Sequence, residues 1–151
     1  MDIKRILVVS REAKYCRTTV DYGVSLCKKY GSELYIIHVV DDSGGLEGYL
    51  EEEHKNNIRK TREELAATIA AENNNGLNVK ELIREGYPAR EISQVVKNEN
   101  IDLIILQANE EGHLEHFLSG GSNDEIIRKM PCSILMVKKE PGPVKVVDLK
   151  I

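Results

Sequence analysis

Residues 34–40 read LYIIHVV, an almost unbroken apolar run. His38 is the one side chain in it that can gain a charge near neutral pH. Such a run, without polar alternation, is typical of a strand buried on both faces of a parallel sheet. Four other runs occur before and after it, and the third of the five is more polar. They are Ile6 to Val9, Leu77 to Glu85, Leu103 to Leu106, and Ile134 to Val137. The sequence therefore predicts five strands, the third of them near an edge of the sheet.

Helical patterns separate these runs. Between the first two, apolar or small residues recur at spacings of three and four, as on one face of an amphipathic helix: Cys16, Val20, Gly23, Val24 and Cys27. A longer, more charged helix is predicted around Leu65 and Ile69, a third begins at Pro88, and a short fourth contains Ile126. Strict alternation of strand and helix predicts a parallel sheet with right-handed crossovers and helices on both faces.

Composition narrows the class of protein. The chain has 151 residues, 41% hydrophobic and 30% charged, with a net charge of -4, which fits one ordinary globular domain without a nucleic-acid surface. No apolar run reaches the ~20 residues of a membrane helix, and the N-terminus lacks a signal-peptide pattern. Cys16, Cys27 and Cys132 form no metal or redox motif. We expect a cytoplasmic protein with reduced, core-forming thiols and no membrane partner.

The order of several short motifs resembles the universal stress protein family over about residues 2 to 139. The second strand ends in His-Val-hydrophobic-Asp at residues 38–41, and GYPAREI at residues 86–92 matches the family's Gly-x-Pro-Ala-x-x-Ile turn. NIDLII at residues 100–105 matches the entry to its fourth strand. The resemblance implies an α/β domain over residues 1–139, adenine-nucleotide alpha hydrolase-like, with a single doubly wound parallel five-stranded sheet of order 3-2-1-4-5. Its ligand crevice would lie between strands one and four.

The family's ATP motif is degenerate in this chain. ATP-binding members carry Gly-x-x-Gly, nine residues, then Gly and Ser or Thr after the fourth strand. Here Gln107 and Glu110 take the first two glycine positions, Gly120 and Gly121 take the last two, and Ser122 lies one place further on. The family also has a nucleoside-contacting Asp after its first strand, and Arg11 occupies that position.

These changes should weaken ATP binding severely. A side chain forced into a left-handed conformation costs roughly 1–2 kcal/mol, and Glu110 at ~4 Å from a phosphate charge would cost about 4 kcal/mol. A micromolar complex has only about 8 kcal/mol in total, and Arg11 cannot accept hydrogen bonds as an Asp does. The resemblance thus implies weak or absent ATP and no cofactor. The residues expected to line the crevice are Val9, Arg11, Val39, Gln107, Asn109, Glu110, Gly120, Gly121 and Ser122.

Other site readings are weaker. Ser122 followed by Glu125 forms a capping-box pattern that explains the serine by itself, while a remaining anion contact stays open. His113 and His116 could share a helical face, but a zinc site usually needs a third protein ligand, so we predict no metal. No Ser/His/Asp or Cys/His arrangement stands at a strand end. We therefore predict no catalytic residues.

Two classes of function remain. The first is a non-enzymatic stress-response or regulatory module that acts as a homodimer and binds an unidentified protein partner. The second is a small-ligand or nucleotide sensor that keeps the cleft at the carboxyl ends of strands one and four. An ATPase is a weaker third option, because the phosphate-loop glycines are missing.

The end of the chain predicts how it assembles. The resemblance makes strand five an edge that pairs with the same strand of a second subunit, and an apolar edge favours such pairing. After Pro143 the apolar, β-branched run Val144 to Leu149 suggests that the extension 140–151 contains a further strand. We expect a homodimer through residues 132–149. The alternative is that the last segment folds back on its own subunit.

Overall fold

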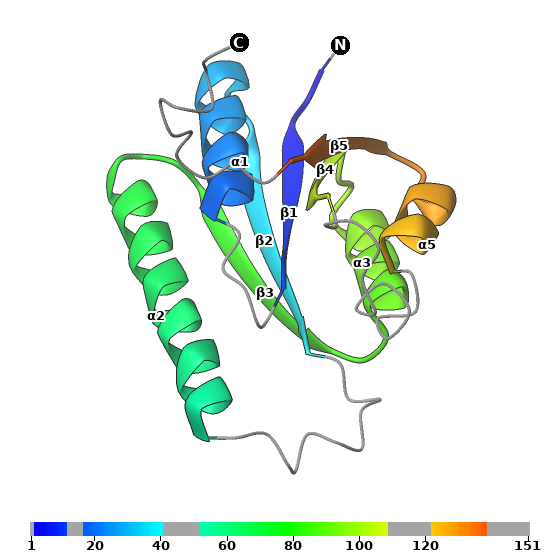
Figure 1. The fold of residues 1–151 in the computed structure, drawn as a ribbon. Helices are drawn as coiled ribbons and strands as arrows, with labels where there is room; N and C mark the ends of the chain where they lie inside the picture. The colour runs from blue at the N-terminus through cyan, green and yellow to red at the C-terminus, as the bar shows by residue number, and fades with distance from the viewer. Residues whose placement is uncertain (1, 12–16, 41–51, 109–121, 139–151) are drawn as a thin grey trace, which may run out of the picture.

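A computed structural model describes residues 2–11, 17–40, 52–108 and 122–138. Strands and helices alternate along them (Figure 1). In chain order the elements are β1 (Arg5–Arg11), α1 (Arg17–Tyr30), β2 (Glu33–Val40), α2 (Glu52–Asn74), β3 (Val79–Glu85), α3 (Pro88–Asn98), β4 (Leu103–Gln107), α5 (Ser122–Lys129) and β5 (Ser133–Val137).

The five strands form one sheet of order β3-β2-β1-β4-β5. Every neighbouring pair is parallel. The fold class and strand order predicted from the sequence are therefore confirmed, and the polar third strand does lie at an edge of this sheet. The order reverses between β1 and β4, so their carboxyl ends flank the topological switch point at which open α/β sheets bind ligands.

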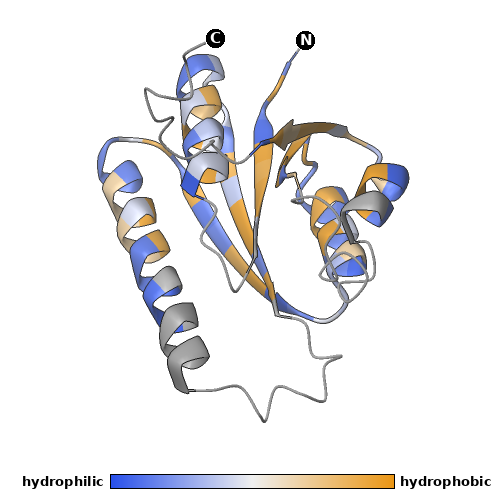
Figure 2. Ribbon diagram, in the orientation of Figure 1, coloured by the Kyte–Doolittle hydropathy of each residue, from blue (hydrophilic) through white to orange (hydrophobic). Residues whose placement is uncertain are grey.

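Helices cover both faces of the sheet, α1 and α2 on one and α3 and α5 on the other (Figure 1). Because successive strand residues point to opposite faces, Ile6 and Val8 join the core under α1 and α2. Leu7 joins the core under α3 and α5. The central strands are apolar on both faces, whereas α2 is hydrophilic over much of its described surface (Figure 2).

A close approach at Gly23 fixes α1 against the sheet. A Cβ built there would lie 2.6 Å from Val8 Cγ2 and 3.0 Å from Leu34 Cδ1. The absence of a side chain thus lets the helix backbone pack directly on β1 and β2. The sequence predicted Gly23 on the inward face of this helix, and the structure confirms it.

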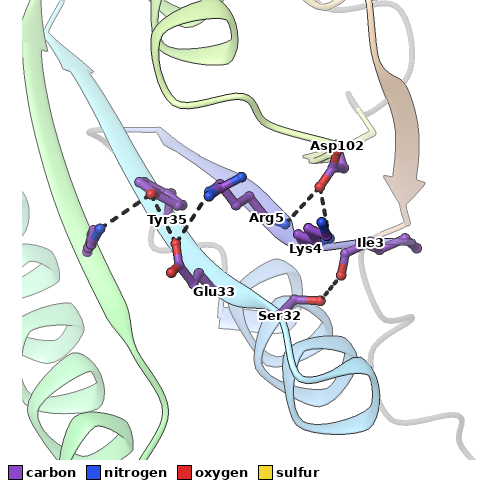
Figure 3. Close-up of polar contacts among 8 residues, drawn as sticks. Ile3, Lys4, Arg5, Ser32, Glu33, Tyr35 and Asp102 are labelled. Atoms are coloured by element: carbon purple, nitrogen blue, oxygen red, sulfur yellow. Dashed lines mark hydrogen bonds and ion pairs between the residues drawn. The ribbon is translucent and has the colours of Figure 1, made fainter. Parts of the chain in front are cut away.

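Polar contacts fix the start of β1 at the amino ends of the strands, opposite the ends that flank the switch point (Figure 3). Asp102 Oδ2 accepts hydrogen bonds from the backbone N–H of Lys4 at 2.8 Å and of Arg5 at 3.0 Å. Arg5 Nε lies 3.5 Å from Glu33 Oε2. The start of β1 is thereby tied to both neighbouring strands.

Candidate functional site

The carboxyl ends of β2, β1 and β4 place four of the predicted crevice residues on adjacent strands. Arg11, the last residue of β1, pairs with Val39 of β2. Val9 and Val39 are half-buried and pack against the core under α3 and α5. Gln107 ends β4 on the other side of β1. The structure therefore brings Val9, Gln107 and the backbone of Arg11 to the two strands that flank the switch point, with Val39 on the adjacent strand β2.

The backbone around Gln107 is strand-like and already hydrogen-bonded. Gln107 pairs with Val137 of β5, and the N–H of Ala108 donates to Val137 O at 2.8 Å. A phosphate cradle needs free backbone N–H groups that converge on the anion. At this point of the chain, one such donor is committed to the sheet.

The remaining predicted crevice residues lie outside what the structure describes. Asn109, Glu110, Gly120 and Gly121 fall within residues 109–121, and His113 and His116 fall in the same range. Ser122 is the first residue of α5, but its side chain, like that of Arg11, is not among those described. These assignments therefore stay predictions.

Glu125, in the first turn of α5, makes two described contacts besides the predicted capping box. Oε1 of Glu125 accepts a hydrogen bond from the Tyr87 hydroxyl at 2.9 Å, and Oε2 lies 3.9 Å from Lys129 Nζ. This carboxylate therefore links α5 to the residue that precedes α3. The half of the box that depends on the Ser122 side chain lies outside the described part.

Sequence reasoning missed a buried polar cluster on the opposite face of the same strand ends. Ser10 and His38 are direct partners on β1 and β2, and each is only 2% exposed. Thr19 in the first turns of α1 is fully buried. The sequence feature that could have revealed this cluster is Ser10, which follows Ile6 and Val8 on the same inward face but has a hydroxyl in place of an apolar group.

The geometry of α1 places Thr19 near Ser10. Gly23 of α1 lies over Val8 of β1, and α1 runs back along the strand that precedes it. Thr19 is four residues before Gly23, about 6 Å along the helix, and Ser10 is two residues after Val8, about 6.6 Å along the strand. The hydroxyl oxygens of both residues are buried without a hydrogen-bond partner among the described residues.

His38 is buried in a setting that favours the neutral imidazole. Its Nε2 lies 3.4 Å from Glu81 Oε1, without the alignment of a hydrogen bond. Burial lowers the pKa of His38 below its usual value of 6.5, and the Arg62 guanidinium lowers it further. The burial of His38 fits a structural role for this side chain.

The described cysteines are not arranged for nucleophilic chemistry. Burial raises the pKa of Cys27 to about 12. Burial and then the Asp102 carboxylate raise the pKa of Cys132, which is half-buried. A reactive cysteine needs the opposite shift. Cys27 is the core residue that the sequence predicted, whereas Cys16 lies outside the described residues.

The described residues contain neither a metal-ligand cluster nor a membrane-spanning helix. Across residues 2–11, 17–40, 52–108 and 122–138, no three His, Cys, Asp or Glu side chains gather as metal ligands would. In that same part of the chain, no helix combines the length and apolarity needed to cross a membrane.

Comparison with known proteins gives a consistent result. Residues 2–138 match the model of the universal stress protein family. Universal stress protein MJ0531 of Methanocaldococcus jannaschii is 27% identical over 150 residues, which cover 90% of this chain and 82% of that protein.

Two solved structures show the same fold at low identity. Universal stress protein UspA from Lactobacillus plantarum has a TM-score of 0.70 at 20% identity, covering 91% of this chain and 99% of that one. The universal stress protein from Archaeoglobus fulgidus in complex with dAMP has a TM-score of 0.58 at 16% identity, covering 91% of this chain and all of that one.

Proposed function

This chain belongs to the universal stress protein family, and from that premise we propose that it is a non-enzymatic stress-response or regulatory module. In this proposal it acts in the cytoplasm as a homodimer, engages a protein partner that is still unidentified, and binds ATP weakly or not at all.

The observation that carries the proposal is the end of β4. Gln107 takes the position of the first motif glycine, and the next N–H, that of Ala108, donates to Val137 O. Here the chain has both a side chain and a committed donor where a nucleotide would need close approach of free backbone. Glu110 adds an anionic side chain at the second glycine position of the sequence motif. Both features oppose a triphosphate.

The chemistry of the described residues supports a non-enzymatic role. General acid–base catalysis needs a group whose pKa lies near the working pH and which can reach a substrate. His38 is 2% exposed, and its pKa is lowered by burial. The pKa values of Cys27 and Cys132 are raised.

The homodimer is supported by the character of β5. This edge strand reads Ser-Ile-Leu-Met-Val and contains no charged residue. Its Met136 is 39% exposed. An uncharged edge strand with exposed apolar side chains is suited to pairing with another strand. Residues 139–151, including the predicted strand 144–149, lie outside the described residues, so their part in the interface rests on the sequence alone.

A second candidate function is a sensor for a small ligand. Val9 and Gln107 lie on the strands that flank the switch point and Val39 lies on the adjacent strand, so apolar side chains and one amide could contact a ligand there. One structural neighbour was solved in complex with dAMP, and a monophosphate makes smaller demands on the phosphate loop than ATP does. Native mass spectrometry of the purified protein separates the two candidates. A retained small molecule favours the sensor, and a bare polypeptide favours the partner-binding module.

The proposal predicts that glycine restores nucleotide affinity. The double variant Gln107→Gly/Glu110→Gly should bind Mg-ATP at least about tenfold more tightly than the natural chain, because it removes a charge and two side chains worth several kcal/mol. Titration calorimetry measures the change. The matched control Gln107→Ala/Glu110→Ala removes the charge but not the restriction on positive φ, so it should recover only part of the affinity. Equal affinities of all three proteins, with intact circular dichroism, would assign the defect to Arg11 instead.

A further inference from the structure

The second edge of the sheet, β3, separates its charges by face. By strand alternation Lys80, Leu82 and Arg84 lie on the side of α3 and α5, where Leu82 packs against the core. Val79 packs on the opposite side, under α1 and α2, and Glu81, Ile83 and Glu85 share that side. Both basic residues of the strand therefore lie on one face, and both acidic residues lie on the other. Ile83, between the two glutamates, is 53% exposed.

This segregation determines how β3 could meet itself. A two-fold axis that joins two copies edge to edge in one antiparallel sheet runs normal to the sheet, so each face continues into the same face of the partner. Residues directly opposite each other must then come from the same face. Two charged residues that lie directly opposite each other therefore have the same sign, basic on one face and acidic on the other.

Each central register produces a like-charge pair. Centred on Leu82, Lys80 of one copy lies opposite Arg84 of the other, twice by symmetry. Centred on Ile83, Glu81 lies opposite Glu85. A shift by one further step brings Glu81 opposite itself or Arg84 opposite itself. Like charges directly opposite destabilise an antiparallel pair.

The outward backbone groups of β3 are also partly occupied. The N–H of Leu34 donates to Asn78 O at 3.0 Å, so the even-numbered residues direct their backbone groups toward β2 and the odd-numbered ones direct theirs away. On this outward side, the Val79 N–H donates to Asn73 Oδ1 at 2.8 Å. Arg84 Nη1 donates to Ile83 O at 3.1 Å.

The two edges of the described sheet therefore differ. β5 is uncharged, whereas β3 has segregated charges and two outward groups bonded to the chain's own side chains. We propose that β3 is an edge closed to the β3 edge of a second copy of this chain, so that once two copies have joined through β5 the assembly stops at the dimer. The statement about β5 rests on the proposed function, whereas the statement about β3 stands by itself.

Charge reversal at one position tests this inference. Arg84→Glu converts both Lys80–Arg84 contacts of the register centred on Leu82 into attractive pairs. The variant should self-associate through β3, about tenfold more tightly than the double variant Lys80→Glu/Arg84→Glu, in which the opposed charges are alike again. Both variants lack the Arg84 contact to Ile83 O, so the comparison isolates the charge. Arg90→Glu, on the exposed surface of α3, is the control for net charge.

Sedimentation velocity of the full chain at tens of micromolar gives the readout. If the natural chain is a dimer, Arg84→Glu should grow into larger, salt-sensitive species, and if it is a monomer, the variant should dimerise. These two results separate a failure of the proposed β5 dimer from a failure of the inference about β3. The inference is overturned if Arg84→Glu and Lys80→Glu each sediment like the natural chain, or if the double variant assembles as tightly as the single ones. Lys80→Glu provides the same attractive pairing should Arg84→Glu fail to fold.

Discussion

At the scale of single residues, three buried polar side chains under α1 reduce the stability of the fold. Ser10 and Thr19 each bury a hydroxyl without a partner among the described residues, and His38 lies beside Ser10. An unsatisfied buried polar group costs roughly 1–3 kcal/mol. The three side chains are therefore a weak point of an otherwise apolar face. A positive charge placed there would be more costly still, because burial disfavours ions.

His38 should make stability fall as the solution becomes acidic. Its pKa in the folded state is lowered, chiefly by burial and then by Arg62, whereas the unfolded chain has the ordinary value of 6.5. As pH falls through 6.5 toward the folded pKa, the unfolded state takes up the proton first, and the free energy of unfolding drops by about 1.4 kcal/mol per pH unit. Well above pH 6.5 both states are neutral at this residue and the effect is absent.

Urea denaturation between pH 7.5 and pH 5 measures this effect. His38→Asn removes the titrating group, so the stability of the variant should fall less steeply with acid than that of the natural chain. All other residues are common to both proteins, so their contributions cancel from the difference in slope. Parallel stability curves would show that His38 takes up protons equally well in the folded and unfolded states.

At the scale of elements, few of the described side chains of α2 hold this helix to the sheet. Leu65 is fully buried, and Ile69 packs partly against the same core. Lys28 of α1 lies 3.1 Å from Glu72 near the end of α2. The sequence predicted Leu65 and Ile69 on one face of a long charged helix, because apolar residues recur there at helical spacing among charged ones. Attachment of this helix should therefore depend strongly on Leu65.

Leu65→Ala should destabilise the protein by about 2–5 kcal/mol, the usual range for a fully buried leucine. Glu63→Ala, on the exposed surface of the same helix, is the matched control and should change stability by less than about 0.5 kcal/mol. Chemical denaturation of both variants gives the two values. A loss of less than about 1 kcal/mol at Leu65 would mean that other residues hold α2 in place.

Element boundaries show what periodicity could and could not predict. The third strand was expected from Leu77 but begins at Val79, because Leu77 still donates its N–H to Glu72 O in the turn after α2. The fifth strand, expected from the apolar run Ile134 to Val137, begins one residue earlier at Ser133. The apolar runs of β1, β2 and β4 were predicted closely, since burial on both faces leaves an unbroken pattern. Turn hydrogen bonds depend on tertiary geometry and leave no such pattern.

At the scale of the whole molecule, more of the fold than of the candidate site could be predicted from the sequence. The strand order follows from the family resemblance, and the structure confirms it. For the site, the sequence identified Val9, Val39 and Gln107 at the strand ends but not the cluster of Ser10, Thr19 and His38. Single polar residues inside an apolar pattern do not reveal that they meet. Only the register of β1 with β2 and the close packing of α1 at Gly23 bring them together.

The proposed dimer predicts a defined effect of shortening the chain. Truncation after Lys139 leaves β5 intact and removes residues 140–151, including the apolar run Val144 to Leu149. If that run contributes to the interface, the shortened protein should dimerise more weakly in light scattering or sedimentation. Unchanged dimerisation would limit the interface to β5 itself. A full-length chain that is monomeric at tens of micromolar would exclude the dimer.

The proposed function depends above all on weak binding of ATP, which titration calorimetry of the full natural chain with Mg-ATP measures. Substitution of the motif glycines by Gln107 and Glu110, together with Arg11 at the acidic position, should reduce binding from the ~8 kcal/mol of a micromolar complex to about 4 kcal/mol or less. The predicted result is therefore no saturable heat below about 1 mM nucleotide. Saturation with a dissociation constant in the low micromolar range would contradict the account, because it would show that the loop after β4 still holds a triphosphate.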